Sequence, residues 1–393
     1  MRTALVNGRI LAGERIVNGH TVLLADGRIE AIALAADPRC RGAASVDLEG
    51  QLLLPGFIDV QVNGGGGVLF NDDPSLESIR AIGAAHRRYG TTGFLPTLIS
   101  DDLDTIAQAI AAVQASLDAH RPGALGIHIE GPFLNWTRRG VHDPKHLRRL
   151  DNDVISLLCS LRGGRTVLTL APEMTTTDMI ARLAAGGILV SAGHSDANYA
   201  QTAAAIAHGV RGFTHLFNAM APLTPREPGI IGAALYDANT WCGIIVDGHH
   251  VDPVMLKLAL RCKPHDRFML VTDAMPPVGS PATSFILQGR TIHVVDGVCR
   301  DDNGTLAGTG LDMATAVRNA VHLLGLSIAE AARMASEYPA AFLGLDQELG
   351  RIAPGFRADL VLLDDELQVR RTWIGGIAEA PYSSTRDGGA PRA

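Results

Sequence analysis

From about residue 53 to residue 345, apolar runs alternate with stretches of helical spacing, which predicts parallel strands joined by helices. Eight runs are read as strands: LLLPGFIDVQV, TTGFLPTLI, GALGIHIEG, RTVLTLAPE, GILVSAGHS, VRGFTHLFN, WCGIIVDGHH and RFMLVTDAM. Eight such units favour an α/β fold, a (β/α)8 TIM barrel. A doubly wound open sheet is the main alternative. It would place GxGxxG after its first strand, where this chain has NGGGG.

The two ends of the chain have a different pattern, with short β-rich runs between Gly, Asn, Asp and Pro turns. This spacing is typical of small antiparallel sheets, so we expect residues 1–52 and 346–381 to form one small β-sandwich domain together. The barrel domain would then span 53–345, with a β-hairpin excursion near 284–306. Residues 382–393 are rich in Gly, Ser and Pro, and we expect them to form a mobile tail.

Composition narrows the classes of protein that remain. The 393 residues carry a net charge of -7 without a basic block, which argues against a nucleic-acid partner. No apolar run reaches the ~20 residues of a membrane span, so we expect no membrane partner. The cysteines form no close pair and are expected to be reduced core thiols of a cytoplasmic protein. They are Cys40, Cys159, Cys242, Cys262 and Cys299.

Four polar residues stand where predicted strands end: Glu130, His194, His215 and Asp273. The carboxyl ends of barrel strands face one mouth, so we expect these side chains to meet. Two imidazoles and a carboxylate suit a divalent ion such as Zn²⁺ and leave a position for water. Asp273 could take a proton from that water and return it to a leaving group. Each residue alone could instead be a helix cap or a core side chain, but their shared position favours an enzyme.

His142 lies in the loop after the third predicted strand, in RRGVHDP. An imidazole N–H at this place could polarise a carbonyl oxygen opposite the metal. A solvent-facing loop histidine would give the same sequence pattern, so the residue alone is a weak signal.

Several ordered strings in the chain match a known family. They are PGFIDVQVNGGGG at 55–67, GIHIEGPFLN at 126–135, GVHDP at 140–144, SAGHS at 191–195, THLFNAM at 214–220, PREPG around Arg226, VDGHHVDP at 246–253 and VTDAMPP at 271–277. In this order and spacing the chain resembles the N-acetylglucosamine-6-phosphate deacetylases of the metal-dependent amidohydrolase superfamily. The resemblance covers nearly the whole chain.

The resemblance implies hydrolysis of the acetamide of N-acetylglucosamine 6-phosphate to glucosamine 6-phosphate and acetate by metal-activated water. It assigns the metal to Glu130, His194 and His215, makes Asp273 the general base and acid, and lets His142 polarise the acetyl carbonyl. The implied substrate-binding residues are Val141, Asn218, Ala219, Arg226, His250, Leu306, Ala307 and Gly308.

Arg226 and His250 suit a phosphate clamp, because a guanidinium offers bidentate donors to a phosphate. The family builds this clamp across a dimer interface, with the arginine reaching over from the partner chain. The resemblance therefore implies a homodimer whose small-molecule partner is a phosphorylated amino sugar.

One departure from the broader superfamily bears on the metal. Many amidohydrolases place His-x-His after the first strand for a second ion, whereas this chain has Gln61 and Asn63. Neutral amides bind divalent ions less well than imidazole does. We therefore expect one divalent ion per chain, with zinc first and iron, cobalt or manganese as the alternatives.

Three other functions remain as alternatives. An N-acetylgalactosamine-6-phosphate deacetylase would differ only in the orientation of one substrate hydroxyl, which the sequence does not discriminate. A non-catalytic barrel scaffold would lack a ligand or the acid, and neither is missing. A ring-opening amidohydrolase of the dihydroorotase kind is disfavoured, because such enzymes usually use His-x-His and often a bridging modified lysine.

Overall fold

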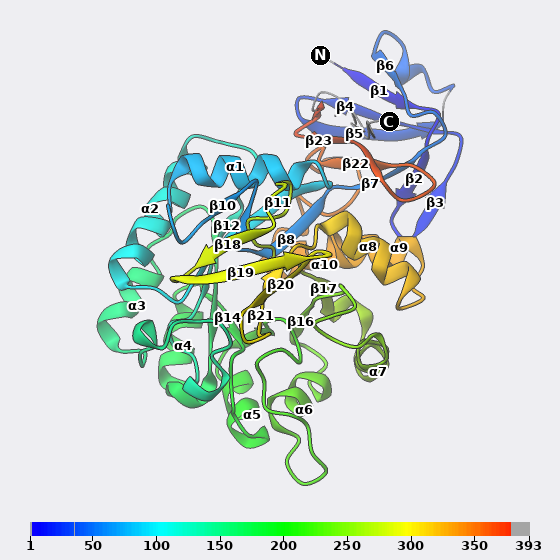
Figure 1. Ribbon diagram of the computed structural model, residues 1–393. Helices are drawn as coiled ribbons and strands as arrows, with labels where there is room; N and C mark the ends of the chain where they lie inside the picture. The colour runs from blue at the N-terminus through cyan, green and yellow to red at the C-terminus, as the bar shows by residue number, and fades with distance from the viewer. Residues whose placement is uncertain (1, 35, 379–393) are drawn as a thin grey trace, which may run out of the picture.

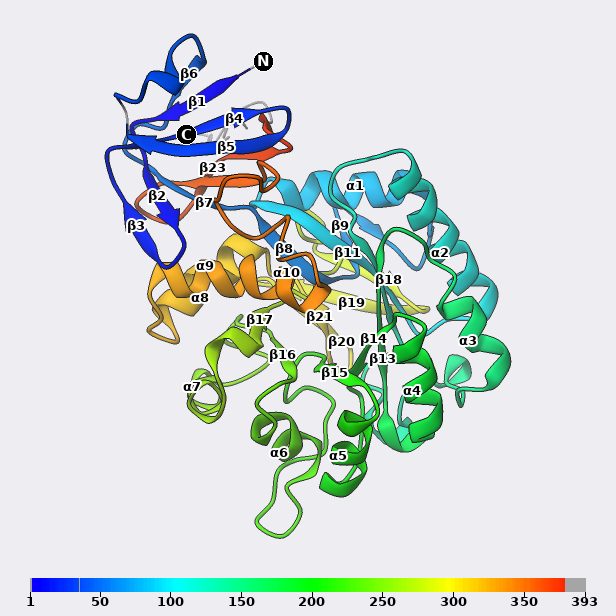
Figure 2. The same cartoon turned by 180° about the vertical axis from the view of Figure 1, so that it is seen from behind.

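The computed structural model describes residues 2–34 and 36–378 and contains two parts. Strands surrounded by helices form the larger part, and a smaller, all-β part lies at its side (Figures 1 and 2). The expected α/β class with a barrel and a small second domain is confirmed. The expected tail at 382–393 lies outside the described residues.

Eight parallel strands form the barrel, and their order around it follows the chain. They are almost entirely buried, as expected for parallel strands covered on both faces. Their bounds are β8 (Phe57–Val62), β11 (Thr91–Ile99), β12 (Gly126–Glu130), β13 (Arg165–Leu170), β14 (Leu189–Ala192), β15 (Val210–Phe213), β16 (Trp241–Ile244) and β17 (Phe268–Leu270). All eight runs expected from the sequence therefore contribute a strand.

The barrel closes between its first and last strands through the segment that follows β17. The backbone N–H of Asp273 donates to the carbonyl oxygen of Gln61 at 3.0 Å, and that of Asn63 donates to the carbonyl oxygen of Ala274 at 2.9 Å. Val62 and Ala274 form a parallel bridge at the same place. The polypeptide around Asp273 is thus part of the barrel wall.

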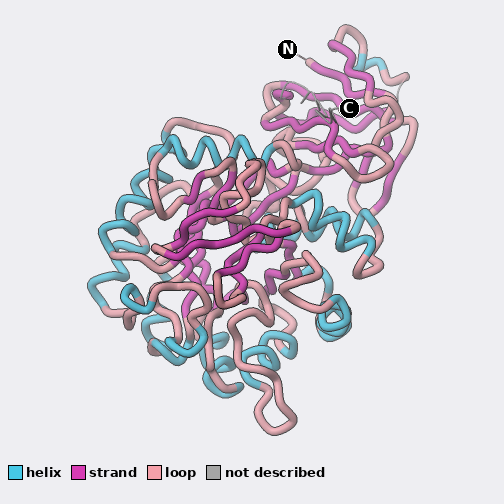
Figure 3. Tube along the Cα trace, viewed as in Figure 1, coloured by secondary structure: helices cyan, strands magenta, loops and turns pink. Residues whose placement is uncertain are grey.

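Helices surround this barrel (Figure 3). In α1 the buried Ile79, Ile82 and His86 recur every three or four residues, so one face packs on the strands. The helices are α1 (Leu76–Arg87), α2 (Leu103–Asp118), α3 (Asn152–Leu158), α4 (Thr177–Ala185), α5 (Tyr199–Ala207), α6 (Gly229–Tyr236), α7 (Pro253–Cys262), α8 (Met313–His322), α9 (Ile328–Met334) and α10 (Glu337–Leu343). Short 3-10 turns are η1 (Pro38–Cys40), η2 (Trp136–Arg138), η3 (Pro144–His146), η4 (Pro172–Met174) and η5 (His265–Arg267).

Strands from both ends of the chain form the small domain as two facing sheets. One has the order β5-β4-β1-β6 and the other the order β24-β23-β22-β7-β2-β3. Leu5, Leu53 and Trp373 belong to the buried cluster between them. The strands are β1 (Thr3–Val6), β2 (Arg9–Ala12), β3 (Arg15–Val17), β4 (His20–Ala25), β5 (Arg28–Leu34), β6 (Ala44–Asp47), β7 (Leu52–Pro55), β22 (Leu360–Leu363), β23 (Val369–Ile374) and β24 (Ile377–Ala378).

The run LLLPGFIDVQV, expected as one strand, is two strands that belong to different domains. β7 pairs with β22 and β2 of the small domain, whereas β8 pairs with β11 of the barrel. Gly56 joins them, and a Cβ at this position would lie 2.3 Å from the hydroxyl oxygen of Thr92. Only a glycine fits this close approach at the point where the chain passes from one domain to the other.

The excursion after β17 is larger than the hairpin expected near 284–306. It is a four-stranded antiparallel sheet of β18 (Ser284–Leu287), β19 (Arg290–Val295), β20 (Val298–Asp301) and β21 (Leu306–Thr309). It lies across one end of the barrel (Figure 1). The backbone N–H of Thr309 donates to the carbonyl oxygen of Asp273, and that of Met275 to Thr309, so β21 is attached to the barrel seam. A short hairpin of β9 (Gly64–Gly65) and β10 (Val68–Leu69) lies after β8.

All five cysteines are free thiols. Cys242 and Cys299 are buried as expected, but the expectation of core packing is wrong for Cys262, which is exposed at the end of α7. Among the described residues, no helix combines the length and hydrophobicity needed to span a bilayer.

Candidate active site

The four strand-end residues meet at the carboxyl end of the barrel. Glu130 is the last residue of β12, and His194, His215 and Asp273 follow β14, β15 and β17 by two or three residues. All four line one cavity of about 420 Å³, a volume within the usual range of small-molecule sites. The expected meeting of these side chains is what the structure shows.

Glu130, His194 and His215 form a compact group of metal-competent atoms. Glu130 Oε1 lies 3.1 Å from His194 Nε2 and 2.9 Å from His215 Nε2, and the two nitrogens are 3.0 Å apart. Zinc bonds of about 2.0–2.1 Å at the tetrahedral angle would separate two ligand atoms by about 3.3 Å. The observed separations are therefore close to those that one ion requires.

The protonation of His194 explains why this group fits a cation. Its Nδ1 lies 2.9 Å from the carbonyl oxygen of Arg138, which can only accept, so Nδ1 carries the proton. Nε2 is then the ring nitrogen that faces Glu130 Oε1 and is available to an ion. A divalent ion could bind the Glu130 oxygen and the two imidazole nitrogens that face one another here. Metal-binding histidines usually donate their other ring N–H to a carbonyl or carboxylate, as His194 Nδ1 does.

The same contacts shift the pKa values of the group. Burial alone would raise the pKa of Glu130, but the two neighbouring imidazoles outweigh it and hold that pKa well below its usual range. Burial would lower the pKa of His215, and its hydrogen bond to Glu130 raises it instead. Glu130 is thus held as a carboxylate at the centre of the group.

Asp273 is half-buried beside this group, and its pKa is raised to about 6 by desolvation and then by the charge of Glu130. Asn63 Nδ2 donates to Asp273 Oδ1 at 2.6 Å, and Gln61 Nε2 donates to the same oxygen at 3.1 Å. Gln61 Nε2 also lies 3.2 Å from Glu130 Oε2. The sequence identified the two amides only as poor metal ligands; their contacts show that they orient the carboxylates.

The backbone is strained at three of these residues. His194, His215 and Asp273 have φ values of 49°, 32° and 51°, in the left-handed region that disfavours residues with a Cβ. Such conformations cost on the order of 1–3 kcal/mol each and concentrate at functional sites. The strain therefore supports the assignment of this end of the barrel as the functional end.

His142 is buried at the same cavity, 4.6 Å from the ring centre of His194. Its pKa is lowered to about 3, first by burial and then by His194, so the ring is neutral. Its Nδ1 lies 2.7 Å from the hydroxyl oxygen of Ser100. The structure thus places the loop histidine at the site and removes it from solvent.

The residues expected to bind substrate fall into two groups. Ala307 is fully buried in the β18–β21 sheet, and Arg226 is exposed in the loop before α6, so neither is among the described residues that line the cavity. The expected residues that do line it are Val141, Asn218, Ala219, His250, Leu306 and Gly308. Lining residues that the sequence reading did not identify are Ile99, Thr137, Arg138, Gly140, Met275, Gly304 and Thr305.

His250 is oriented by a neighbouring carboxylate. Its Nδ1 lies 2.6 Å from Asp247 Oδ2 and donates to it, which leaves Nε2 as the nitrogen available to a ligand. Burial would raise the pKa of Asp247, but the contact with His250 lowers it to about 2. His249, the other member of the His-His pair, is exposed.

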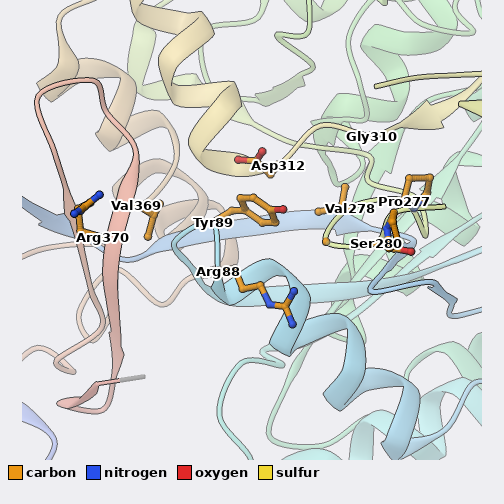
Figure 4. Close-up of a pocket in the computed structure, with 11 residues that line it drawn as sticks. Arg88, Tyr89, Pro277, Val278, Ser280, Gly310, Asp312, Val369 and Arg370 are labelled. Carbon is orange, nitrogen blue, oxygen red and sulfur yellow. The ribbon is translucent and has the colours of Figure 1, made fainter. Parts of the chain in front are cut away.

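A second cavity of about 630 Å³ is lined by Arg88, Tyr89, Asp312 and the residues 277–281, among others (Figure 4). Arg88 and Tyr89 lie between Val369 and Arg370 on one side and the residues 277–280 on the other. The two cavities share no lining residue within the described part of the chain, and the second contains none of the metal-competent group. The larger volume is therefore not the candidate active site.

Comparisons with known proteins agree with this geometry. The model of the Amidohydrolase family matches residues 52–385. An N-acetylgalactosamine-6-phosphate deacetylase of Shewanella sp. is 47% identical over 82% of each chain, and an N-acetylglucosamine-6-phosphate deacetylase of Haemophilus influenzae is 36% identical over 96% of this chain and 99% of the other. The crystal structure of N-acetylglucosamine-6-phosphate deacetylase from Pasteurella multocida matches with a TM-score of 0.93, at 36% identity over 97% of this chain and 100% of the other.

Asp59, in β8 below the site, is fully buried and accepts hydrogen bonds from the backbone N–H groups of Gln61 and Thr272 and from the Thr272 hydroxyl. Burial raises the pKa of its carboxyl to about 7. The folded state therefore favours the neutral acid, and stability is lost as the pH rises from about 4 through about 7. We predict that this loss, on the order of 4 kcal/mol, is absent in Asp59→Asn, whose side chain stays neutral.

Thermal unfolding of both proteins between pH 4 and pH 8 measures this difference. The unfolding temperature of the wild type should fall relative to that of the variant as the pH rises. Parallel curves would show that Asp59 is not held as a neutral acid.

Proposed function

The chain belongs to the amidohydrolase family, and we propose that it hydrolyses the acetamide of N-acetylglucosamine 6-phosphate to glucosamine 6-phosphate and acetate. The observation that carries this proposal is the meeting of Glu130, His194, His215 and Asp273 in one cavity at the carboxyl end of the barrel. The names of the relatives supply the substrate class, an N-acetylated amino sugar 6-phosphate.

Glu130, His194 and His215 would hold one divalent ion, which would polarise the acetyl carbonyl and lower the pKa of water beside it. Zinc is our first choice, with iron, cobalt and manganese as alternatives that accept the same ligands. Gln61 and Asn63 would not hold a second ion tightly, because neutral amides bind divalent ions less well than imidazole does; their N–H groups instead donate to Asp273 and Glu130.

Asp273 would transfer the proton, and His142 would stabilise the oxyanion. Asp273 removes a proton from the attacking water as its oxygen bonds to the acetyl carbon, and His142 stabilises the negative carbonyl oxygen by hydrogen bonding. Asp273 then returns the proton to the sugar nitrogen as the C–N bond breaks. A buried carboxylate suits this double role, because it is a base when ionised and an acid once it has taken the proton from water.

The phosphate would be bound by His250 of the same chain and by Arg226 of a partner chain in a homodimer. Arg226 lies in an exposed loop, outside the cavity of its own chain. Large apolar side chains are exposed on this loop and on α6 and α7: Leu223, Tyr236, Val254, Met255 and Leu258. Exposed apolar surface of this kind suits a protein interface, and a partner would cover it.

We place the protein in the cytoplasm, because five free thiols suit a reducing compartment. A second candidate function is deacetylation of N-acetylgalactosamine 6-phosphate. It is favoured by the 47% identity to the Shewanella relative of that name. The two substrates differ at one hydroxyl, so both belong in the first assay.

We predict that the purified protein releases acetate from N-acetylglucosamine 6-phosphate, that a chelator abolishes this activity, and that zinc restores it. Metal analysis should find one ion per chain. Acetate release that survives complete removal of metal would contradict the mechanism. A higher kcat/KM for the galacto epimer would select the second candidate function, and two tightly bound ions in active protein would contradict the single-ion site.

Asp273→Asn should bind the substrate but lower kcat by ~10²–10⁴-fold, because an amide cannot carry the proton. Stopped assays give kcat, and calorimetry with the intact substrate gives the affinity. Asp237→Asn, at the C-terminal end of α6 and away from the cavity, makes the same chemical change and should leave kcat unchanged. Near-normal turnover in Asp273→Asn would exclude the residue as general base.

Arg226→Ala should raise KM for the phosphorylated substrate by ~10–100-fold, the loss expected for a hydrogen bond to a charged group. It should leave kcat nearly unchanged. Arg121→Ala, an exposed arginine outside the cavity, is the matched control. Mixing Arg226→Ala with Asp273→Asn subunits should restore low-KM activity, because a mixed dimer contains one site with both an intact Asp273 and a partner arginine. The absence of such restoration would contradict a clamp built in trans.

A further inference from the structure

Ser100, the first residue after β11, presents two hydrogen-bond donors to one nitrogen of His142. Its hydroxyl oxygen lies 2.7 Å from His142 Nδ1, and its backbone nitrogen lies 3.3 Å from the same atom. Both residues are buried, with relative exposures of 1% and 2%. Water therefore does not compete for this nitrogen.

The backbone contact shows which ring nitrogen carries the proton, and the hydroxyl contact strengthens that preference. A backbone N–H can only donate, so Nδ1 of His142 must accept and must be the nitrogen without a proton. The hydroxyl of Ser100 then donates to the same lone pair. We propose that Ser100 is a positioning residue that keeps the proton of His142 on Nε2, the nitrogen left free to donate to the substrate carbonyl.

This inference rests on the proposed function in one respect, the role of His142 toward the carbonyl oxygen. With the proton on Nδ1, Nε2 would present a lone pair to that oxygen, and the contact would be repulsive. With the proton on Nε2, the same contact is a hydrogen bond that strengthens as negative charge develops. The tautomer therefore determines whether His142 assists or opposes the reaction.

The Ser100 hydroxyl packs against Gly131, where no other residue type would leave room for it. A Cβ at Gly131 would lie 2.3 Å from Ser100 Oγ, and Gly131 itself has a φ of 90°, which disfavours other residues. Gly131 directly follows Glu130 at the end of β12. The hydroxyl thus occupies a position that a side chain at 131 would take.

Gln288 fixes the peptide groups on both sides of this contact. Its Nε2 donates to the carbonyl oxygen of Ser100 at 2.7 Å, and its Oε1 accepts from the backbone N–H of Asp143 at 2.7 Å. Gln288 lies in the two-residue turn between β18 and β19, where it and Gly289 both have positive φ. Through this one side chain, the β18–β21 sheet therefore holds Ser100 and the segment of His142 at a fixed position relative to each other.

The direct test is nitrogen NMR of the zinc-loaded protein with ¹⁵N-labelled histidine, in which the His142 signals are assigned by their loss in His142→Gln. We expect Nδ1 to resonate as an unprotonated ring nitrogen and Nε2 as a protonated one. In Ser100→Ala the hydroxyl donor is lost and the weaker backbone donor remains. The Nδ1-protonated form should then become populated, and kcat should fall about tenfold or more with little change in KM.

Ser336→Ala is the matched control, because it removes another fully buried serine hydroxyl that donates to a backbone carbonyl, away from the cavity. It should change neither the His142 signals nor kcat. A wild-type spectrum with the proton on Nδ1 would overturn the proposal, and so would unchanged kcat in Ser100→Ala.

A second variant tests the role of Gln288. Gln288→Asn keeps a residue that tolerates positive φ but shortens the side chain, so it can no longer reach both Ser100 and Asp143. It should lower kcat in the same direction as Ser100→Ala. Asp296→Asn places the same residue at the same position of the turn between β19 and β20 and should leave kcat unchanged. Equal kcat in Gln288→Asn and Asp296→Asn would contradict the role of Gln288 in holding Ser100 and His142 in place.

Failure of this inference is distinguishable from failure of the proposed function. If neither amino sugar phosphate is deacetylated, the proposed function is wrong, while the NMR spectrum still decides where the proton of His142 resides. If acetate is released but the proton is on Nδ1, the function stands and the role of Ser100 is excluded.

Discussion

Backbone hydrogen bonds join the segment after β17 to the end of β8, and the geometry of the site depends on them. The same short stretch that closes the barrel at Asp273 and Ala274 also contains the candidate base, while Gln61 and Asn63 on the opposite side of the seam donate to its carboxylate. Closure of the sheet therefore sets the position of the base without a flexible loop. A barrel seam has few alternative registers, because a shift would break pairing on both sides.

Much of this arrangement follows from the sequence. Each of the eight apolar runs forms a barrel strand, and the residues at their ends meet because parallel strands present their carboxyl ends together. The split of LLLPGFIDVQV was missed, because periodicity does not show that Gly56 must approach Thr92 closely. The exposure of Cys262 was missed for a similar reason, since it depends on which face of α7 packs on the barrel.

Contacts between side chains that are distant in sequence were less predictable. Gln61 and Asn63 were noticed as departures from a metal-binding pattern, but their donation to carboxylates from two other strand ends requires coordinates. Gln288 lies in a turn whose sequence suggests only a hairpin, yet its side chain reaches the neighbours of His142. Arg226 is exposed on its own chain, in keeping with its proposed action in the site of a partner chain.

The division of the small domain between the two ends of the chain affects how the protein can fold. β7 pairs with β22, which is synthesised roughly three hundred residues later. Until then β2 and β7 have an exposed edge and an uncovered apolar face, and closing so long a loop is slow. A ribosome-bound chain would therefore complete its barrel before its sandwich, and truncation ahead of Leu360 would leave an edge that is prone to aggregation.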